Sequence, residues 1–385
     1  MSIFKKLFRN REFEPDAVIS SGRAADSGIN LLTLQPDGLN ERRLYDNLRC
    51  SVPIVDAALQ KIIRLTGGYR VICSDRRYQA EMDEFTESVP VGIGGMSLYA
   101  FTDAFLDSML TYGSAAGEII VNDSTGNIEG LELKSPDRFR CRRGASPCER
   151  RYFVMGENGE WYPPKNPQFM LYAALNPTAK MPGGQSVLRG LPCLSAVLMR
   201  IYQCIGQNFD RVGNVRYAVT YKPSDSGEMA FAKERACQIA KEWSDGMSAL
   251  RCGEVKDFVA VGDVDIKVIG ADNQVIGTQV PARQLLEQIV AKLSVPPFLL
   301  GLNWSSTERM SSQQADILTS ELEYYRRQLN PVIKQICGTY LTLLGGSGTV
   351  SVEWDNINLQ DEAVLAEARL HNAQAALLEK QLEEK

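Results

Sequence analysis

Residues 281–344 read PARQLLEQIVAKLSVPPFLLGLNWSSTERMSSQQADILTSELEYYRRQLNPVIKQICGTYLTLL, and this stretch decides the fold. In both halves apolar residues recur at spacings of three and four, which is the pattern of one buried helical face. Pro296 and Pro297 end the first helix, because a prolyl ring cannot donate to the helical ladder. Pro331 is expected to interrupt and kink the second helix. The stretch therefore predicts a helix, a loop that carries Trp304, and a longer helix.

The segments before and after this stretch predict a mixture of helices and strands. Residues 1–40 lack long apolar runs and are expected to form an extended arm. The remaining predicted elements are, in order, helices over 41–65 and 76–89, a helix capped by Ser97, a meander of antiparallel strands over 115–175, a long apolar helix after 182–184, a compact α/β unit over 213–280, and a strand and an acidic helix after 346.

The composition is that of an ordinary globular protein of 385 residues, with 44% apolar and 23% charged residues. A net charge of -5 argues against a general nucleic-acid coat, which would be basic, but not against a protein that lets DNA slide past. Nine scattered cysteines without a CxxC pair predict free thiols in a reducing cytoplasm. We expect no signal peptide and no membrane span, since no apolar run is long enough for either.

Candidate catalytic groups are few, and we predict no catalytic residue, no metal site and no cofactor. His371 is the only histidine, which removes most Ser-His-Asp, Cys-His and histidine–metal chemistry. The glycine turn at 92–95 lacks the GK[ST] ending of a phosphate loop and is expected to be a plain start of a helix. Asp263 and Asp265 alternate on a predicted strand and could together hold Mg²⁺, although a solvent-facing turn and strand is the favoured interpretation.

One strongly basic cluster lies within the predicted meander. Alternation places Arg138, Arg140 and Arg142 on one face of a strand. Both a phosphate-contacting patch and a solvated or subunit-bridging hairpin remain open, and the second is favoured because no aromatic residue alternates among the arginines as a stacking platform. The cluster consists of Arg138, Arg140, Arg142, Arg143, Arg150 and Arg151.

The order of these segments resembles the portal protein of tailed bacteriophages, the head-to-tail connector of long-tailed phages, over essentially the whole chain. The stretches that carry the likeness are LYDNLRCSVPIVDAALQKIIRLTGGYRV (44–71), LELKSPDRFRCRR (131–143), YFVMGENGEWYPPKNPQFMLYA (152–173), PGGQSVLRGLPCLSAVLMRI (182–201), LLEQIVAKLSVPPFLLG (285–301) and SSQQADILTSELEYYRRQLNPVIKQI (311–336).

The resemblance implies an α+β, portal-type subunit with a β-rich wing, long stem and tunnel helices and a small α/β clip. The implied parts are a flexible N-terminal arm at 1–40, a wing at 41–185, stem helices at 186–212 and 281–295, a clip at 213–280, a tunnel loop at 296–311, a tunnel helix at 312–344 and a short crown at 345–385.

The resemblance also implies a function without enzyme activity. Such subunits form a ring, usually of twelve copies, at one vertex of the viral capsid, and double-stranded DNA passes through it without sequence specificity during packaging and ejection. The implied partners are the large terminase subunit, head-completion or adaptor proteins, and a capsid or scaffold protein, with no membrane. The implied location is the virion, with assembly in the host cytoplasm.

Within the implied tunnel loop, five residues are expected to face DNA, although packing of Trp304 against a neighbouring subunit is equally open. They are Asn303, Trp304, Ser305, Ser306 and Arg309. Two other functions remain as alternatives. One is a phage-encoded, metal-dependent transferase that uses paired carboxylates. The other is a capsid or adaptor subunit that only assembles.

Overall fold

The structure, a computed structural model, describes residues 39–357 with gaps at 123, 147–148, 214–215, 223–233, 235–236, 242–262, 270–276 and 303–307. Almost all of the expected arm and most of the expected crown lie outside these residues. Within them helices and strands are mixed along the chain, which confirms the predicted combination of helix and sheet.

The first four helices pack on one another: α1 (Leu39–Ser51), α2 (Pro53–Thr66), α3 (Gln79–Ser88) and α4 (Leu98–Tyr112). The helix predicted over 41–65 is divided into α1 and α2, because the chain breaks at Val52 and Pro53 takes the first position of α2, where its missing N–H is not needed. As predicted, Ser97 caps α4, and its side chain accepts a hydrogen bond from the Ala100 N–H.

A five-stranded sheet packs against α4. Its strands are β2 (Pro90–Val91), β3 (Gly95–Met96), β4 (Ser114–Val121), β5 (Ile128–Lys134) and β9 (Met170–Ala174), in the order β3-β2-β5-β4-β9. β4 and β5 are antiparallel, but β2 runs parallel to β5, with Val91 opposite Leu131. The glycine turn at 92–95 joins β2 to β3, so the expectation that it simply starts a helix is wrong.

A separate three-stranded sheet consists of β6 (Phe139–Arg143), β7 (Arg150–Met155) and β8 (Trp161–Tyr162). The single meander predicted over 115–175 is therefore wrong, since the chain leaves the first sheet after β5 and returns to it only with β9. Phe139 packs with Ala116 of β4 and Met170 of β9, and this small cluster joins the two sheets.

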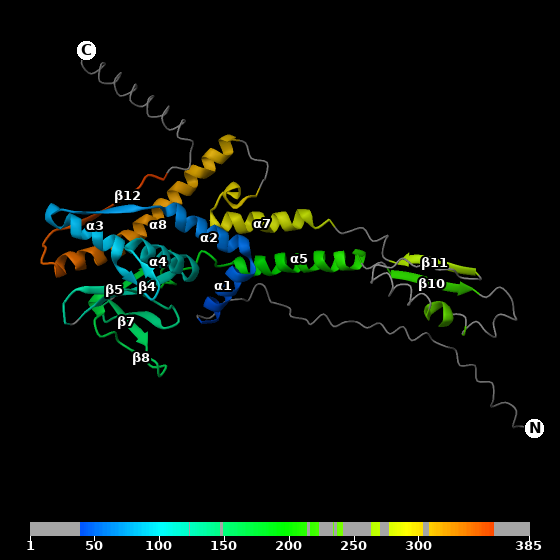
Figure 1. Ribbon diagram of the computed structural model, residues 1–385, viewed down its shortest axis with the longest axis horizontal. Coiled ribbons are helices and arrows are strands. Elements are labelled where there is room, and N and C mark those ends of the chain that lie inside the picture. Colours follow the sequence, from blue (N-terminus) through cyan, green and yellow to red (C-terminus); the bar gives the residue numbers. More distant parts are fainter. Residues whose placement is uncertain are drawn as a thin grey trace, which may run out of the picture.

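Alternation along β4 shows which layer covers each face of the five-stranded sheet. A Cβ atom on Gly117 would lie 2.8 Å from the Phe101 ring, so this face lies against α4. The neighbouring Ala116 packs with Phe139 and so faces the three-stranded sheet. Because α3 packs on α4, the layers follow in the order α3, α4, five-stranded sheet and three-stranded sheet (Figure 1).

Two long helices, α5 (Leu191–Gly213) and α7 (Gln279–Leu293), lie side by side and lead away from this body (Figure 1). Beyond their far end β10 (Arg216–Lys222) pairs antiparallel with β11 (Asp263–Ile269). The prediction that the prolines end α7 is wrong. The helix stops at Leu293, because Ser294 takes a left-handed conformation with φ 55° before either proline is reached.

The longest helix, α8 (Glu308–Leu343), contacts α2, α4, β9 and β12 (Val350–Trp354). It continues through Pro331, so the predicted interruption is wrong. β12 pairs antiparallel with β1 (Tyr69–Cys73), so the first residues of the expected crown contact the strand that follows α2. Three short 3-10 helices complete the described elements: η1 (Arg76–Tyr78), η2 (Pro167–Phe169) and η4 (Pro297–Leu300).

Candidate functional site

Most of the residues predicted to face DNA lie outside the described part of the chain, namely Asn303, Trp304, Ser305 and Ser306. Arg309, which was expected in the loop, belongs to the first turn of α8, and its side chain is not among those described. The contact of these five residues with DNA therefore stays a prediction.

The chain segment before this loop is anchored to the body. Val295 is 2% exposed, and Leu299 and Leu300 of η4 pack against the core. Gly301 then ends η4 in a left-handed conformation with φ 74°. On the other side of the loop, Met310 of α8 is 49% exposed. The loop thus leaves from a fixed corner and returns to the exposed first turns of α8.

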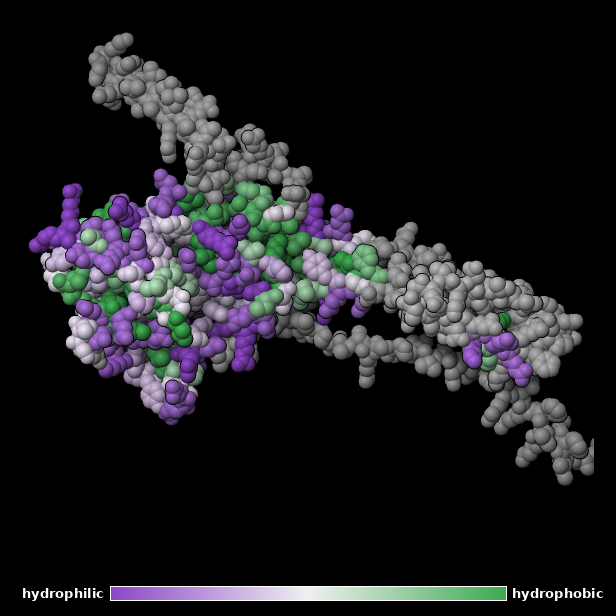
Figure 2. All heavy atoms as spheres, viewed as in Figure 1, coloured by the Kyte–Doolittle hydropathy of each residue, from purple (hydrophilic) through white to green (hydrophobic). Residues whose placement is uncertain are grey.

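Large apolar side chains are exposed along α5, α7 and α8. Tyr202 and Phe209 of α5, Val280 of α7 and Ile317 of α8 are between 45% and 67% exposed in the single subunit. Figure 2 shows hydrophobic surface over α7 and η4. Full burial of one such side chain stabilises a contact by about 1.5–3 kcal/mol. These positions therefore suit contact with another protein chain.

The six predicted arginines lie together on β6, β7 and the adjoining turns, and we call this segment, residues 138–151, the arginine hairpin. Arg142 lies opposite Arg151, and Arg143 lies opposite Arg150. Like charges that face each other directly across two strands destabilise the pair. Arg140 and Arg142 share one face of β6, whereas Arg138 belongs to the turn before the strand. The hairpin therefore concentrates positive charge at a cost to its own stability.

Aromatic rings support three of these guanidinium groups. The Arg140 guanidinium lies 3.9 Å from the centroid of the Trp161 ring, that of Arg142 lies 5.8 Å from Phe153, and that of Arg150 lies 5.7 Å from Tyr172. As the sequence indicates, no aromatic residue alternates among the arginines along β6. The rings come instead from β7, β8 and β9, which the sequence of the arginine strand could not show. Such contacts orient a cation without neutralising it.

Carboxylates neutralise the hairpin only in part. Glu149 lies 3.3 Å from Arg151 and also accepts hydrogen bonds from the N–H groups of Ala145 and Ser146. The backbone N–H of Ser146, the Arg151 side chain and the N–H of Ala145 hold the pKa of Glu149 below its usual value. Four of the hairpin's arginines have no carboxylate of a described residue within ion-pair distance: Arg138, Arg140, Arg142 and Arg150.

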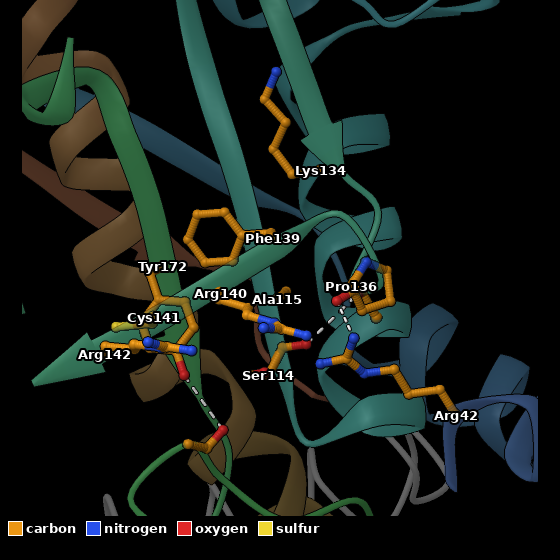
Figure 3. Close-up of a pocket in the computed structure, with 13 residues that line it drawn as sticks. Arg42, Ser114, Ala115, Lys134, Pro136, Phe139, Arg140, Cys141, Arg142 and Tyr172 are labelled. Atoms are coloured by element: carbon orange, nitrogen blue, oxygen red, sulfur yellow. Dashed lines mark hydrogen bonds between the residues drawn. The ribbon is translucent and has the colours of Figure 1, made fainter. Parts of the chain in front are cut away.

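A pocket of about 220 Å³ lies beside β6, and its charged lining residues are Arg42, Lys134, Arg140 and Arg142 (Figure 3). Arg42 reaches in from α1, donates to the Pro136 carbonyl and lies 3.2 Å from a carboxylate oxygen of Asp137. The ammonium of Lys134 contacts two nearby carboxylates at 2.6 and 2.7 Å. Positive charge without a described counter-charge therefore comes from the two hairpin arginines.

The ionisable groups under the hairpin are held neutral. Burial raises the pKa of the Cys141 thiol and that of the Tyr172 hydroxyl above their usual values, and the nearby Arg150 opposes this only in part. Neither group offers a nucleophile at neutral pH. The chemistry of this surface is thus that of fixed positive charge.

The described residues contain no group of three or more His, Cys, Asp or Glu side chains placed to hold a metal ion. Asp263 and Asp265 lie on β11, opposite Lys222 and Thr220 of β10, and their side chains are not among those described. In the part of the chain that the structure covers, no helix has both the length and the apolar character needed to cross a bilayer.

Comparison with known proteins finds likeness in structure and not in sequence. No protein-family model matches the chain, and no curated protein matches it. A chain in the virion of the native gene transfer agent (GTA) particle is 16% identical, over 86% of this chain and 89% of that chain, with a TM-score of 0.60. A chain in the neck of the native GTA particle, computed with C12 symmetry, is 16% identical over 86% and 88%, with a TM-score of 0.57.

An HK97-family phage portal protein from Corynebacterium diphtheriae also matches, at 13% identity over 83% of this chain and 95% of that chain, with a TM-score of 0.42. At 16% identity the GTA matches show a shared fold across most of both chains. They support the resemblance to the phage portal protein that the sequence carries.

Proposed function

We propose that this chain is the portal subunit of a tailed phage or a phage-derived particle. It forms a ring at one capsid vertex, conducts DNA during packaging and ejection, and serves as the platform for the tail. The observation that carries the proposal is the fold shared with a chain of the GTA neck, a particle part that was computed with C12 symmetry. A subunit of this fold suits a ring of twelve.

The proposed parts follow the observed elements. Residues 41–185 are the wing, α5 and α7 are the stem helices, and the β10–β11 pair belongs to the clip. The clip binds the large terminase subunit and later the head-completion or adaptor proteins, and a capsid or scaffold protein surrounds the ring. The protein acts in the virion after assembly in the host cytoplasm, and its role is structural rather than enzymatic.

The first half of α8 suits a surface along which DNA slides. Over residues 308–323 one cation, Arg309, stands against four carboxylates: Glu308, Asp316, Glu321 and Glu323. Each phosphate that a protein neutralises adds affinity for DNA, so a cationic lining would slow its passage. An acidic helix leading into the proposed tunnel loop avoids this.

Electron microscopy of the purified protein tests the proposal. We expect rings with a central hole and radial projections, and light scattering should give a particle mass twelve times the 42.7-kDa mass of one chain. Phe209→Ser should shift the protein from rings to monomers, because Phe209 is 67% exposed on α5. Ile93→Ser, at an exposed turn, is the matched control. A uniform monomer with metal-dependent turnover would overturn the proposal in favour of an enzyme.

A further inference from the structure

Two surfaces of opposite charge lie on opposite sides of α4 and the five-stranded sheet. The arginine hairpin belongs to the three-stranded sheet on one side, and α3 lies on the other side, next to the β1–β12 pair (Figure 1). The exposed carboxylates of α3 are spaced three residues apart and form what we call the acidic face: Glu81, Glu84 and Glu87.

The carboxylates of the acidic face have no cationic partner among the described residues. None of its three glutamates forms an ion pair with a described residue, whereas the neighbouring Asp83 accepts a hydrogen bond from Gln79 at 2.8 Å and lies 3.5 Å from Arg70. The opposite side of α3 is fixed, because Met82 and Phe85 are buried and Phe85 stacks on Tyr340 at 3.9 Å. The acidic face is therefore held on a rigid, outward-facing helix.

The arginine hairpin carries the opposite charge to the acidic face, and its side chains are likewise held in place. Arg140 and Arg142 have no carboxylate partner among the described residues and are oriented by Trp161 and Phe153. Two residues apart on a strand, they stand about 7 Å from each other. Glu81 and Glu87 are separated by about 9 Å along the helix axis. Long, flexible side chains can pair across this difference.

In a closed ring each subunit contacts its two neighbours through two different surfaces on opposite sides. A chain that carries a basic and an acidic surface on opposite sides of α4 and the five-stranded sheet meets this requirement with complementary charge. We propose that the arginine hairpin of one copy binds the acidic face of α3 on the next copy in the ring. This inference rests on the proposed ring and identifies one of its subunit contacts.

The complementary surface on the same chain favours a second copy over DNA as the occupant. The chain as a whole has a net charge of -5, so any attraction to phosphate would be confined to the hairpin. The guanidinium fork binds phosphate as well as carboxylate, so DNA binding is the alternative that the test must distinguish.

Charge reversal and rescue test this contact. The variants are Arg140→Glu/Arg142→Glu, Glu81→Arg/Glu87→Arg, and the combination of all four changes. The readout is the protein concentration at which half of the subunits are in rings, measured by mass photometry. Each double variant should raise this concentration at least about tenfold, since like charges brought together at an interface cost far more than an exposed pair gains. The combined variant should restore it.

The control is Arg64→Glu, which reverses one exposed charge on α2, outside both surfaces. Double variants that form rings at the wild-type concentration would overturn the inference, and so would a combined variant that shows no rescue. If Arg140→Glu/Arg142→Glu forms normal rings but no longer binds double-stranded DNA in a gel-shift experiment, the hairpin binds phosphate instead. If the wild-type chain forms no rings at all, the proposed function fails first, so the two failures are distinct.

Discussion

The side chain of Arg326 donates a hydrogen bond from Nε to the main-chain oxygen of Thr66 at 2.8 Å, although 260 residues separate them. Thr66 is the last residue of α2, where backbone carbonyls lack helical partners. Arg326 is 3% exposed, contacts Glu323 at 3.2 Å and lies 5.1 Å from the centroid of the Trp354 ring. One buried cation thus joins α2, α8 and β12.

Replacing Arg326 with methionine should lower the free energy of unfolding. The Thr66 carbonyl would lose the hydrogen bond that it accepts from the Arg326 guanidinium. A hydrogen bond to a charged group contributes about 1.5–3 kcal/mol. Urea unfolding followed by circular dichroism measures the change. Arg327→Met is the matched control, because Arg327 is exposed on the same helix. Equal stability of the two variants would contradict the role given to Arg326.

Gly113 should not tolerate a side chain. It ends α4 in a left-handed conformation with φ 86°, and a Cβ atom there would lie 2.6 Å from the backbone of Gln185 and Ser186. Gly126 shares the left-handed conformation, with φ 72°, but has open space around it. Gly126→Ala should cost about 1–2 kcal/mol for the conformation alone, and Gly113→Ala should cost clearly more. Thermal unfolding of the two variants measures the difference, and equal losses would show that the close approach is unimportant.

The order of the hairpin tip should depend on the ionisation of Glu149. Its pKa is below the usual value in the folded chain, so the ionised carboxylate holds the tip at neutral pH. This order is fully present above the pKa of the unfolded chain and is lost as the pH falls through the lower, folded value. Hydrogen exchange of the tip should be faster in Glu149→Gln than in the wild type at pH 7, and the difference should vanish in strong acid. A difference that persists there would point to a cause other than this charge.

Deleting residues 302–307 should leave rings intact and impair DNA packaging or retention. The deletion removes the proposed tunnel loop, while Val295, Leu299 and Leu300 keep the corner packed on the core. Electron microscopy of the rings and a nuclease-protection measurement of packaged DNA read the two effects separately. Loss of the rings would show that the loop is an assembly element and that its residues do not serve the channel.

The sequence predicted elements whose signals are local. The helix after Ser97 was predicted from its apolar spacing and its cap. The helices before and after the two prolines, α7 and α8, were predicted from their own apolar spacing. The clustering of the arginines was also visible, because they are near neighbours in the chain. In each case residues within one turn or one hairpin determine the outcome.

Contacts between distant segments were missed. β2 pairs with β5, and β1 pairs with β12, but the residue pattern of a strand does not show which distant strand it pairs with. The position of Arg326 had no signal either, because an arginine on a helix is ordinarily solvent-exposed. At Pro331 the local sequence predicted an interruption that does not occur. The helix continues through Pro331 while it contacts α2, α4, β9 and β12.

The pairing of β1 with β12 has a consequence for synthesis. Tyr69 faces Trp354 across the two strands, so the sheet closes only after nearly all of the described chain has been made. A prematurely terminated chain lacks β12. It would leave the edge of β1 unpaired and Arg326 without its aromatic neighbour. We therefore expect the body to finish folding only after release from the ribosome, so that an incomplete chain would reach the proposed ring without a closed body.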